Sequence, residues 1–213
     1  MPARPVTRLL KTAIHAMPLA LLLPAAAQAA CPMYSDLEIG IVLVTREEDN
    51  VLTEVFRSIS SQLISYHMMN DGVAGYTELT GHGVHPMVTT DLYDGKVLSS
   101  VYSYDTPFPQ IPEPAPGLEW QGSYDVVDAD GSARGTRQMT VGDYETISFG
   151  DCTYRALPVR FDIVEGDDEA THDVFLYLPE IAVSVLVSGG VGEESYDYEL
   201  PGEIRVLGDG ASE

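Results

Sequence analysis

The sequence predicts a mainly β protein, an antiparallel meander whose curved sheet would form a half-barrel or a sandwich. The clearest indication lies in residues 145–200, where apolar and polar side chains alternate in three successive segments. A period of two places each apolar set on one face of a strand, and one such face covers a core. Glycine-containing turns separate the segments at Gly150-Asp151, Gly166-Asp167-Asp168 and Gly189-Gly190. The alternating apolar residues are Val159, Phe161 and Ile163, then Ile181, Val183, Val185 and Val187, then Tyr196, Tyr198 and Leu200.

Residues 1–29 have the organisation of a secretory signal peptide. A positively charged start precedes an apolar run over residues 19–27, and Ala27-Gln28-Ala29 has the small-x-small form of a signal-peptidase site. The run is short for a membrane span, so we expect no transmembrane segment after cleavage. A lipoprotein would be acylated at Cys31, but Gln28 stands where a leucine-like residue is expected. We therefore predict simple export to the periplasm or the medium.

The composition of the chain is strongly acidic. Residues 1–29 hold three of the 11 Lys and Arg and none of the 33 Asp and Glu, so the net charge of −22 becomes −25 for the rest. Lys96 is then the only lysine. Binding to nucleic acid or to an anionic membrane needs a basic surface, which this chain lacks. Solubility in a salty medium is the simplest interpretation, and an acidic docking surface for a cationic partner is the alternative.

Two cysteines, Cys31 and Cys152, remain in the exported chain. An even count in an exported protein indicates a disulfide, and no Cys-x-x-Cys suggests a redox or metal pair. Such a long loop restricts the unfolded chain by about 4–5 kcal/mol in the entropy model. We expect residues 30–207 to form a single β-rich domain that this bond ties together.

The first half of this domain contains a series of strand and hairpin signals. Residues 37–44 form the first expected strand, and Asn70-Asp71-Gly72 and Asp94-Gly95 are turn signals of hairpins. The strands around these turns are expected at residues 75–80, 87–93 and 97–104. Residues 51–69 fit two structures. We favour two strands, because Val, Thr, Ser and Ile are weak helix formers, over one helix at residues 51–66.

A proline-rich stretch over residues 106–117 follows the hairpins. Prolines at near-alternate positions exclude a helix and ladder hydrogen bonds, so we expect an extended strap between two parts of one domain. Residues 120–127 and 135–141 then form a hairpin, and residues 208–213 form a disordered tail.

His82 and His85 are the sharpest candidates for a metal site. On a loop their rings could converge on Zn²⁺, with a carboxylate or another histidine as further ligand. No His-Glu-x-x-His motif accompanies them, and surface histidines are the simpler interpretation. No cofactor is therefore expected, and a metal-assisted hydrolase using His82 and His85 is the alternative function.

Tyrosines and arginines give the candidate ligand site. Tyrosine-rich strands could line a cavity for an amphipathic ligand, although tyrosine is also a common half-buried strand residue. Arg134, Arg137, Arg155 and Arg160 could form an anion site on one sheet face, or pair with acids on neighbouring strands. The candidate ligand-binding residues are Tyr102, Tyr104, Tyr154, Tyr177, Arg155 and Arg160.

The order of three features, Gly150, Tyr177-Leu178-Pro179 and the Tyr-rich segment 196–200, resembles an uncharacterised family of proteobacterial periplasmic β-rich domains. That family is similar to the half-barrels of lipoprotein-localisation factors. The resemblance covers about a quarter of the chain and implies a fold, but no catalytic residue.

These observations together predict an exported acidic β domain without enzymatic activity. It would be a periplasmic binding or scaffold protein, and its partner would be an apolar or lipid-like ligand or another envelope protein.

Overall fold

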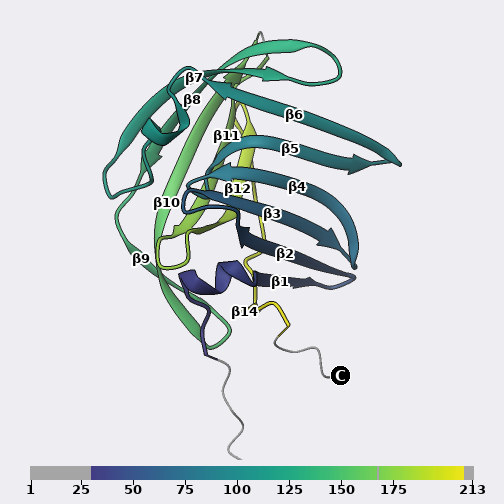
Figure 1. The fold of residues 1–213 in the computed structure, drawn as a ribbon, viewed down its shortest axis with the longest axis vertical. Helices are drawn as coiled ribbons and strands as arrows, with labels where there is room; N and C mark the ends of the chain where they lie inside the picture. Colours follow the sequence, from purple (N-terminus) through teal and green to yellow (C-terminus); the bar gives the residue numbers. More distant parts are fainter. Residues whose placement is uncertain (1–29, 167, 209–213) are drawn as a thin grey trace, which may run out of the picture.

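A computed structural model describes residues 30–166 and 168–208 of the chain (Figure 1). The predicted signal peptide, residues 1–29, and all but the first residue of the predicted tail lie outside the described residues. In the described part the only helical elements are two short 3₁₀ turns, η1 (Tyr34–Glu38) and η2 (Phe108–Gln110). The predicted mainly β, antiparallel fold class is confirmed.

The described residues contain fourteen strands. They are β1 (Ile41–Glu47), β2 (Asn50–Ser58), β3 (Leu63–Asn70), β4 (Val73–Gly81), β5 (His85–Tyr93), β6 (Lys96–Tyr104), β7 (Glu119–Val127), β8 (Ser132–Val141), β9 (Glu145–Phe149), β10 (Cys152–Glu165), β11 (Thr171–Leu178), β12 (Val183–Val191), β13 (Glu194–Asp197) and β14 (Glu203–Val206).

One antiparallel sheet contains nearly all of these strands, in the order β13-β12-β11-β10-β8-β7-β6-β5-β4-β3-β2-β1-β14. The order is a meander, except that β9 pairs with β10 beside this path and β14 returns to pair with β1. The last strand therefore lies next to the first (Figure 1).

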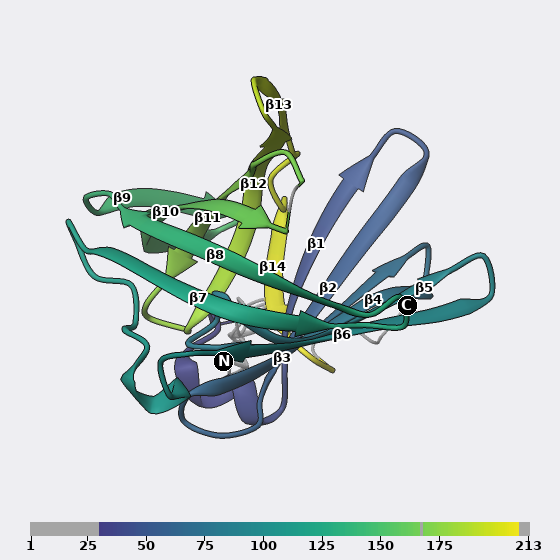
Figure 2. The same cartoon turned by 90° about the horizontal axis from the view of Figure 1, so that it is seen from above.

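The sheet curls until its two ends pack against each other (Figure 2). The largest core cluster unites β1–β3 and β14 from one end with β9–β12 from the other, and η1 covers it through Leu37. A second cluster lies under β8, β10 and β11. Burial of apolar side chains between the two ends is what closes the curl.

The alternative of a helix at residues 51–66 is wrong, because β2 and β3 occupy this stretch as antiparallel neighbours. Val55 packs with Val42 and Val44 on one face of the sheet, whereas Phe56 enters the main core on the other. A strand that buries apolar residues on both faces loses its clean alternation. Its pattern then imitates a helix face.

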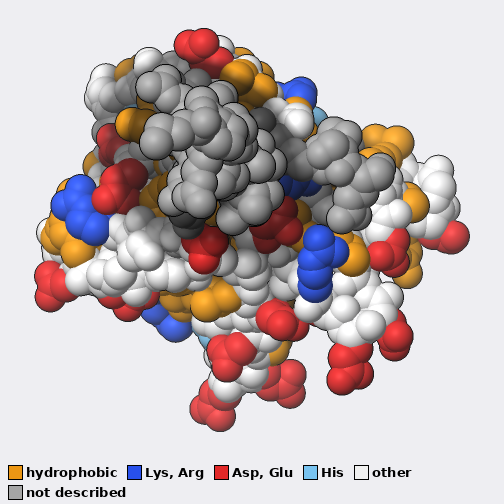
Figure 3. Space-filling model, turned by 90° about the horizontal axis from the view of Figure 1, so that it is seen from below, with side chains coloured by type: hydrophobic (Ala, Val, Ile, Leu, Met, Phe, Trp, Pro, Cys, Tyr) orange, Lys and Arg blue, Asp and Glu red, His pale blue; other side chains and the backbone are white. Residues whose placement is uncertain are grey.

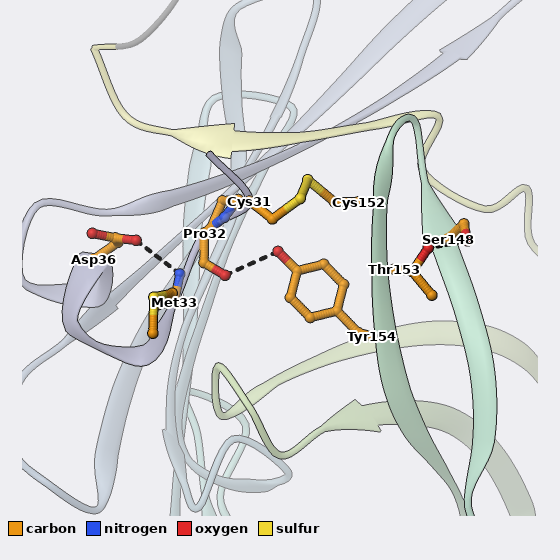
Figure 4. Close-up of a disulfide and its surroundings, with 8 residues drawn as sticks. All are labelled: Cys31, Pro32, Met33, Asp36, Ser148, Cys152, Thr153 and Tyr154. Atoms are coloured by element: carbon orange, nitrogen blue, oxygen red, sulfur yellow. Dashed lines mark hydrogen bonds between the residues drawn. A yellow bond between two sulfur atoms is a disulfide. The ribbon is translucent and has the colours of Figure 1, made fainter. Parts of the chain in front are cut away.

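The structure joins Cys31 to Cys152, as expected from the cysteine count (Figure 4). The Tyr154 hydroxyl donates a hydrogen bond of 3.0 Å to the Pro32 carbonyl beside this bond. The Met33 backbone N–H donates one of 2.7 Å to the Asp36 carboxylate. The start of the described chain is thus attached to β10 by the disulfide and by the Tyr154 hydrogen bond.

The proline-rich strap runs between β6 and β7 and packs across the ends of other strands. Ile111 is buried, and the Phe108 ring lies so close to Gly81 that an added Cβ there would be 2.1 Å from it. The Tyr177 hydroxyl of β11 donates a hydrogen bond of 2.6 Å to Glu113 in the strap. The strap therefore connects the end of β4 to β11.

Candidate functional site

A cavity of about 350 Å³ lies inside the curl of the sheet. This volume lies in the range of small-molecule sites, about 300–1,000 Å³. Ten strands, β2–β8 and β10–β12, contribute to its wall. The lining side chains with apolar or aromatic bodies are Phe56, Tyr66, Met68, Tyr76, Val84, Pro86, Tyr102, Tyr124, Ile163, Phe175 and Leu186, and the charged ones are Glu54, Glu78, Arg137, Glu165 and Asp173.

The turn between β4 and β5, residues 82–84, reaches across the curl and closes one side of this cavity. We call it the plug turn. Ser184 of β12 donates a hydrogen bond to the Gly83 carbonyl, and Arg137 of β8 donates one of 3.3 Å to the Val84 carbonyl. Gly83 has a φ of +72°, and an added Cβ would lie 2.6 Å from the Ala182 carbonyl oxygen. Glycine is therefore required where the plug turn touches β12.

Three tyrosine hydroxyls on the cavity wall donate hydrogen bonds to glutamates. A phenol is a good donor to a carboxylate that has lost most of its water. These contacts orient the acids and leave the tyrosine rings facing the cavity. The pairs are Tyr66 with Glu54 at 2.9 Å, Tyr76 with Glu78 at 3.0 Å, and Tyr124 with Glu165 at 2.5 Å.

Burial makes several cavity acids hold their protons more tightly than usual. It raises the pKa of Glu78 to about 7, although the Tyr76 hydrogen bond and the Arg137 charge oppose the rise. Burial also raises the pKa of Glu54 against the Tyr66 hydrogen bond, and the pKa of Asp173 against the Arg137 charge. Removal of water disfavours the charged carboxylate. Near neutral pH Glu78 can therefore become neutral.

Arg137 is the cation of this cavity. Its side chain is buried, its guanidinium lies 3.7 Å from the centre of the Phe161 ring, and its Nε has no hydrogen-bond partner. Among the described residues, no carboxylate oxygen lies within 4.0 Å of an Arg137 guanidinium nitrogen. A buried guanidinium held by one carbonyl and one ring is unusual, because buried charges are normally paired.

The other arginines considered together with Arg137 are exposed and paired. Arg155 pairs with Glu180 at 3.0 Å and Arg160 pairs with Asp162 at 2.7 Å. Arg134 bridges Asp105 and Asp125. Neither predicted ligand-binding arginine, Arg155 or Arg160, lines the cavity.

The four predicted ligand-binding tyrosines have different surroundings. Tyr102 lines the cavity, and the ring of Tyr104 packs against Tyr124 and Trp120 next to it. Tyr154 lies in the main core beside the disulfide. Tyr177 lines a second cavity of about 290 Å³ under the strap, together with His82 and Glu113. The structure therefore does not bring the six predicted residues together in one site.

Two charged residues of the cavity, Arg137 and Glu54, are not among the six candidate ligand-binding residues, and they share a simple sequence signal. Arg137 is in phase with the buried Met139 and Val141 along β8, and Glu54 is in phase with Phe56 along β2. On a strand, residues two apart share a face. A charged residue in the apolar phase of a strand therefore indicates a polar group inside the curl.

His82 and His85 lie in different surroundings. His85 is fully buried among the rings of Tyr104, Trp120 and Phe161, and burial lowers its pKa to about 3. His82 packs on Phe108, with the two ring centres 5.3 Å apart. Across the described residues, no group of three or more His, Cys, Asp and Glu side chains is arranged to hold a metal ion. The metal-assisted hydrolase stays an untested prediction.

The exterior of the protein is acidic. The face in Figure 3 shows more Asp and Glu than Lys and Arg side chains, in line with the net charge of the chain. Among the described residues no helix has the length and apolar character to cross a membrane.

No protein-family model and no curated protein matches this chain. Among solved structures, the chain is similar to the hypothetical lipoprotein YmcC from Escherichia coli (K12). The two share 11% sequence identity, the similarity covers 78% of this chain and 81% of that chain, and the TM-score is 0.43.

Proposed function

We propose that this protein is an exported, non-enzymatic binding protein, and that the cavity inside the curled sheet holds a small amphipathic ligand that is lipid-like over most of its length. The observation that carries this proposal is the lining of the cavity. Aromatic and aliphatic side chains from both halves of the curl surround a space of small-molecule size. A mostly apolar cavity with a few fixed polar groups is the usual form of a ligand site.

The polar groups of the cavity support binding better than catalysis. Glu54, Glu78 and Glu165 are each held by a tyrosine hydroxyl, which fixes them in place. None of the residues that line the cavity is a histidine or a cysteine. The lining therefore suits the recognition of a ligand with an apolar body and a polar end. An envelope protein as the partner, the other expectation from the sequence, stays untested.

A cavity-filling substitution tests this function. Ile163 lines the cavity, whereas its neighbour Val164 is exposed on the opposite face of β10. Ile163→Trp should fill the cavity and abolish saturable binding of a hydrophobic fluorescent probe, measured by titration. Val164→Trp is the matched control and should bind like the wild type, and circular dichroism should show that both variants are folded.

The proposal also predicts what accompanies the natural protein. Native mass spectrometry of protein isolated from its own cell envelope should detect a co-purifying lipid-like molecule that the Ile163→Trp variant lacks. The proposed function is wrong if the wild type binds no probe saturably, or if Ile163→Trp and Val164→Trp bind it equally.

A further inference from the structure

We propose that the ligand carries an acidic head group, a carboxylate, and that Arg137 holds this group against the plug turn. The inference rests on the proposed function, since it names the chemistry of the ligand that the cavity would take. It starts from one observation: a buried guanidinium that lines the cavity and lacks an anionic partner among the described residues.

The hydrogen bonds of Arg137 leave most of its donors unused. A guanidinium has five N–H groups in a planar fork that matches a carboxylate. In the described structure one of them reaches the Val84 carbonyl at 3.3 Å, and Nε has no acceptor. The Phe161 ring covers one face of the group at 3.7 Å, but a ring supplies no oxygen acceptor. A carboxylate could satisfy two of the unused donors at once.

A second unused donor lies close to the first. The Tyr104 hydroxyl is buried beside the Arg137 guanidinium and donates no hydrogen bond among the described residues. Burial raises the pKa of this hydroxyl to about 12, and Arg137 opposes the rise by its charge and as a hydrogen-bond donor to the phenol oxygen. The hydroxyl therefore keeps its proton at neutral pH and is available as a donor next to the guanidinium.

The acids of the cavity do not satisfy Arg137, although they outnumber it. The positive charge of Arg137 lowers the pKa of Glu78 and of Asp173, but neither carboxylate lies within ion-pair distance of the guanidinium. Carboxylates that burial disfavours can escape the cost of their charge by taking up a proton. Arginine has no such route, because it stays protonated in proteins. Arg137 is therefore the charged group of the cavity that a bound counter-ion would stabilise most. This favours an acidic ligand over a basic one.

The head group can be tested with three probes that share one twelve-carbon chain: dodecanoate, dodecanol and dodecyltrimethylammonium. Each would displace the hydrophobic fluorescent probe from the full exported, disulfide-bonded protein. A hydrogen-bonded charge pair is worth about 1.5–3 kcal/mol, so dodecanoate should bind roughly 10- to 100-fold more tightly than dodecanol. Dodecyltrimethylammonium should be the weakest of the three.

Arg137→Gln should remove the preference for dodecanoate over dodecanol, measured as the ratio of the two affinities within the variant. Arg160→Gln is the matched control, because Arg160 is exposed, pairs with Asp162 and does not line the cavity. It should keep the full preference. Arg137→Lys keeps the positive charge but loses the planar fork, and should retain part of the preference.

The possible outcomes separate this inference from the proposed function. If dodecanol or dodecyltrimethylammonium binds as tightly as dodecanoate, the chain-binding function stands and the acidic head group is wrong. If none of the three displaces the probe, both are wrong. If Arg137→Gln does not fold, the head-group series with wild type and Arg137→Lys decides the question, because only a role in recognition changes the ratio between probes.

Discussion

Two regions of the sheet contain strands with many apolar residues but bury their side chains very differently. In the disulfide-linked region, β10 to β12 hold residues such as Phe161, Leu178 and Val183 with no exposed surface. In the hairpin of β5 and β6, Tyr93 and Val97 are 70% and 65% exposed. Alternation places apolar residues on one face of a strand, but only a second layer over that face buries them.

The cavity lies between these two regions and takes a different contribution from each. The disulfide-linked region supplies the apolar side chains Ile163, Phe175 and Leu186 and the polar side chains Glu165, Asp173 and Ser184. Strands β2 to β6 supply most of the tyrosines, together with Glu54 and Glu78. Both regions therefore contribute apolar and polar groups to the cavity, which suits a ligand with an apolar body and a polar end. The predictions below test how strongly the two regions differ.

The disulfide should make the largest difference to stability. It closes a loop with a sequence separation of 121 residues, so its removal by Cys31→Ser with Cys152→Ser should lower the free energy of unfolding by about 4–5 kcal/mol in the entropy model. Urea unfolding followed by circular dichroism measures this. Wild-type protein treated with a reductant should unfold at the same urea concentration as the double variant. Equal stability of oxidised and reduced wild type would contradict the prediction.

The two regions should also respond differently to the same truncation. Leu178→Ala in the closed core should cost about 2–5 kcal/mol, because it leaves a cavity in a fully buried position. Leu98→Ala in the exposed hairpin should change stability by no more than about 0.5 kcal/mol. Thermal unfolding of both variants gives the comparison. Similar losses would mean that the hairpin is covered in solution, for example by a second copy or a partner.

The cavity wall should give the protein a pH-dependent stability through Glu78. Its pKa is raised from 4.5 in the unfolded chain to about 7 in the folded one. The folded state therefore holds the proton more tightly, and this contribution to stability is present below pH 4.5 and is lost as the pH rises through 7. This rise in the pKa of Glu78 corresponds to at most about 3 kcal/mol of the free energy of unfolding.

Glu78→Gln should remove this loss, so the variant should be more stable than wild type at pH 8 and similar at pH 4.5. Unfolding by urea at several pH values measures the difference between the two proteins. Glu194→Gln on the exposed strand β13 is the control and should follow the wild-type profile. A constant difference between Glu78→Gln and wild type over this pH range would contradict the assigned role of Glu78.

The sequence predicts the strands of this fold well, because alternation and turn residues are local signals. The strands at residues 159–163 and 183–187 and the turns at Asn70-Asp71-Gly72 and Asp94-Gly95 all appear where they were expected. The secondary structure of residues 51–69 was harder to predict, since β2 packs on both faces and its apolar residues do not all lie on one of them. Local patterns therefore predict strands best where one face alone is buried.

The site depends on contacts that no local pattern contains. The curl places Glu54 of β2 and Asp173 of β11 on one cavity, although 119 positions separate them in the sequence. Arg137 and Arg160 are both arginines within β strands, but only Arg137 is in phase with the buried apolar residues of its strand. That phase was readable from the sequence, whereas the distance between the two ends of the sheet was not.

The smallest predicted effect concerns the strap that links the two regions. The Tyr177 hydroxyl donates a hydrogen bond of 2.6 Å to Glu113, and the Tyr177 side chain is fully buried. Tyr177→Phe keeps the ring and removes only this bond, which should cost about 1–2 kcal/mol in the free energy of unfolding. Tyr93→Phe, at an exposed position in the hairpin, should cost almost nothing.

Hydrogen exchange gives a second measurement of the same contact. If Glu113 anchors the strap to β11, Tyr177→Phe should speed amide exchange at residues 110–115 while the exchange of β10 stays as slow as in wild type. Glu113→Gln should have a similar but smaller effect, because the amide oxygen can still accept the hydrogen bond. Unchanged exchange over residues 110–115 in Tyr177→Phe would mean that packing of Ile111 and Phe108, rather than this hydrogen bond, holds the strap in place.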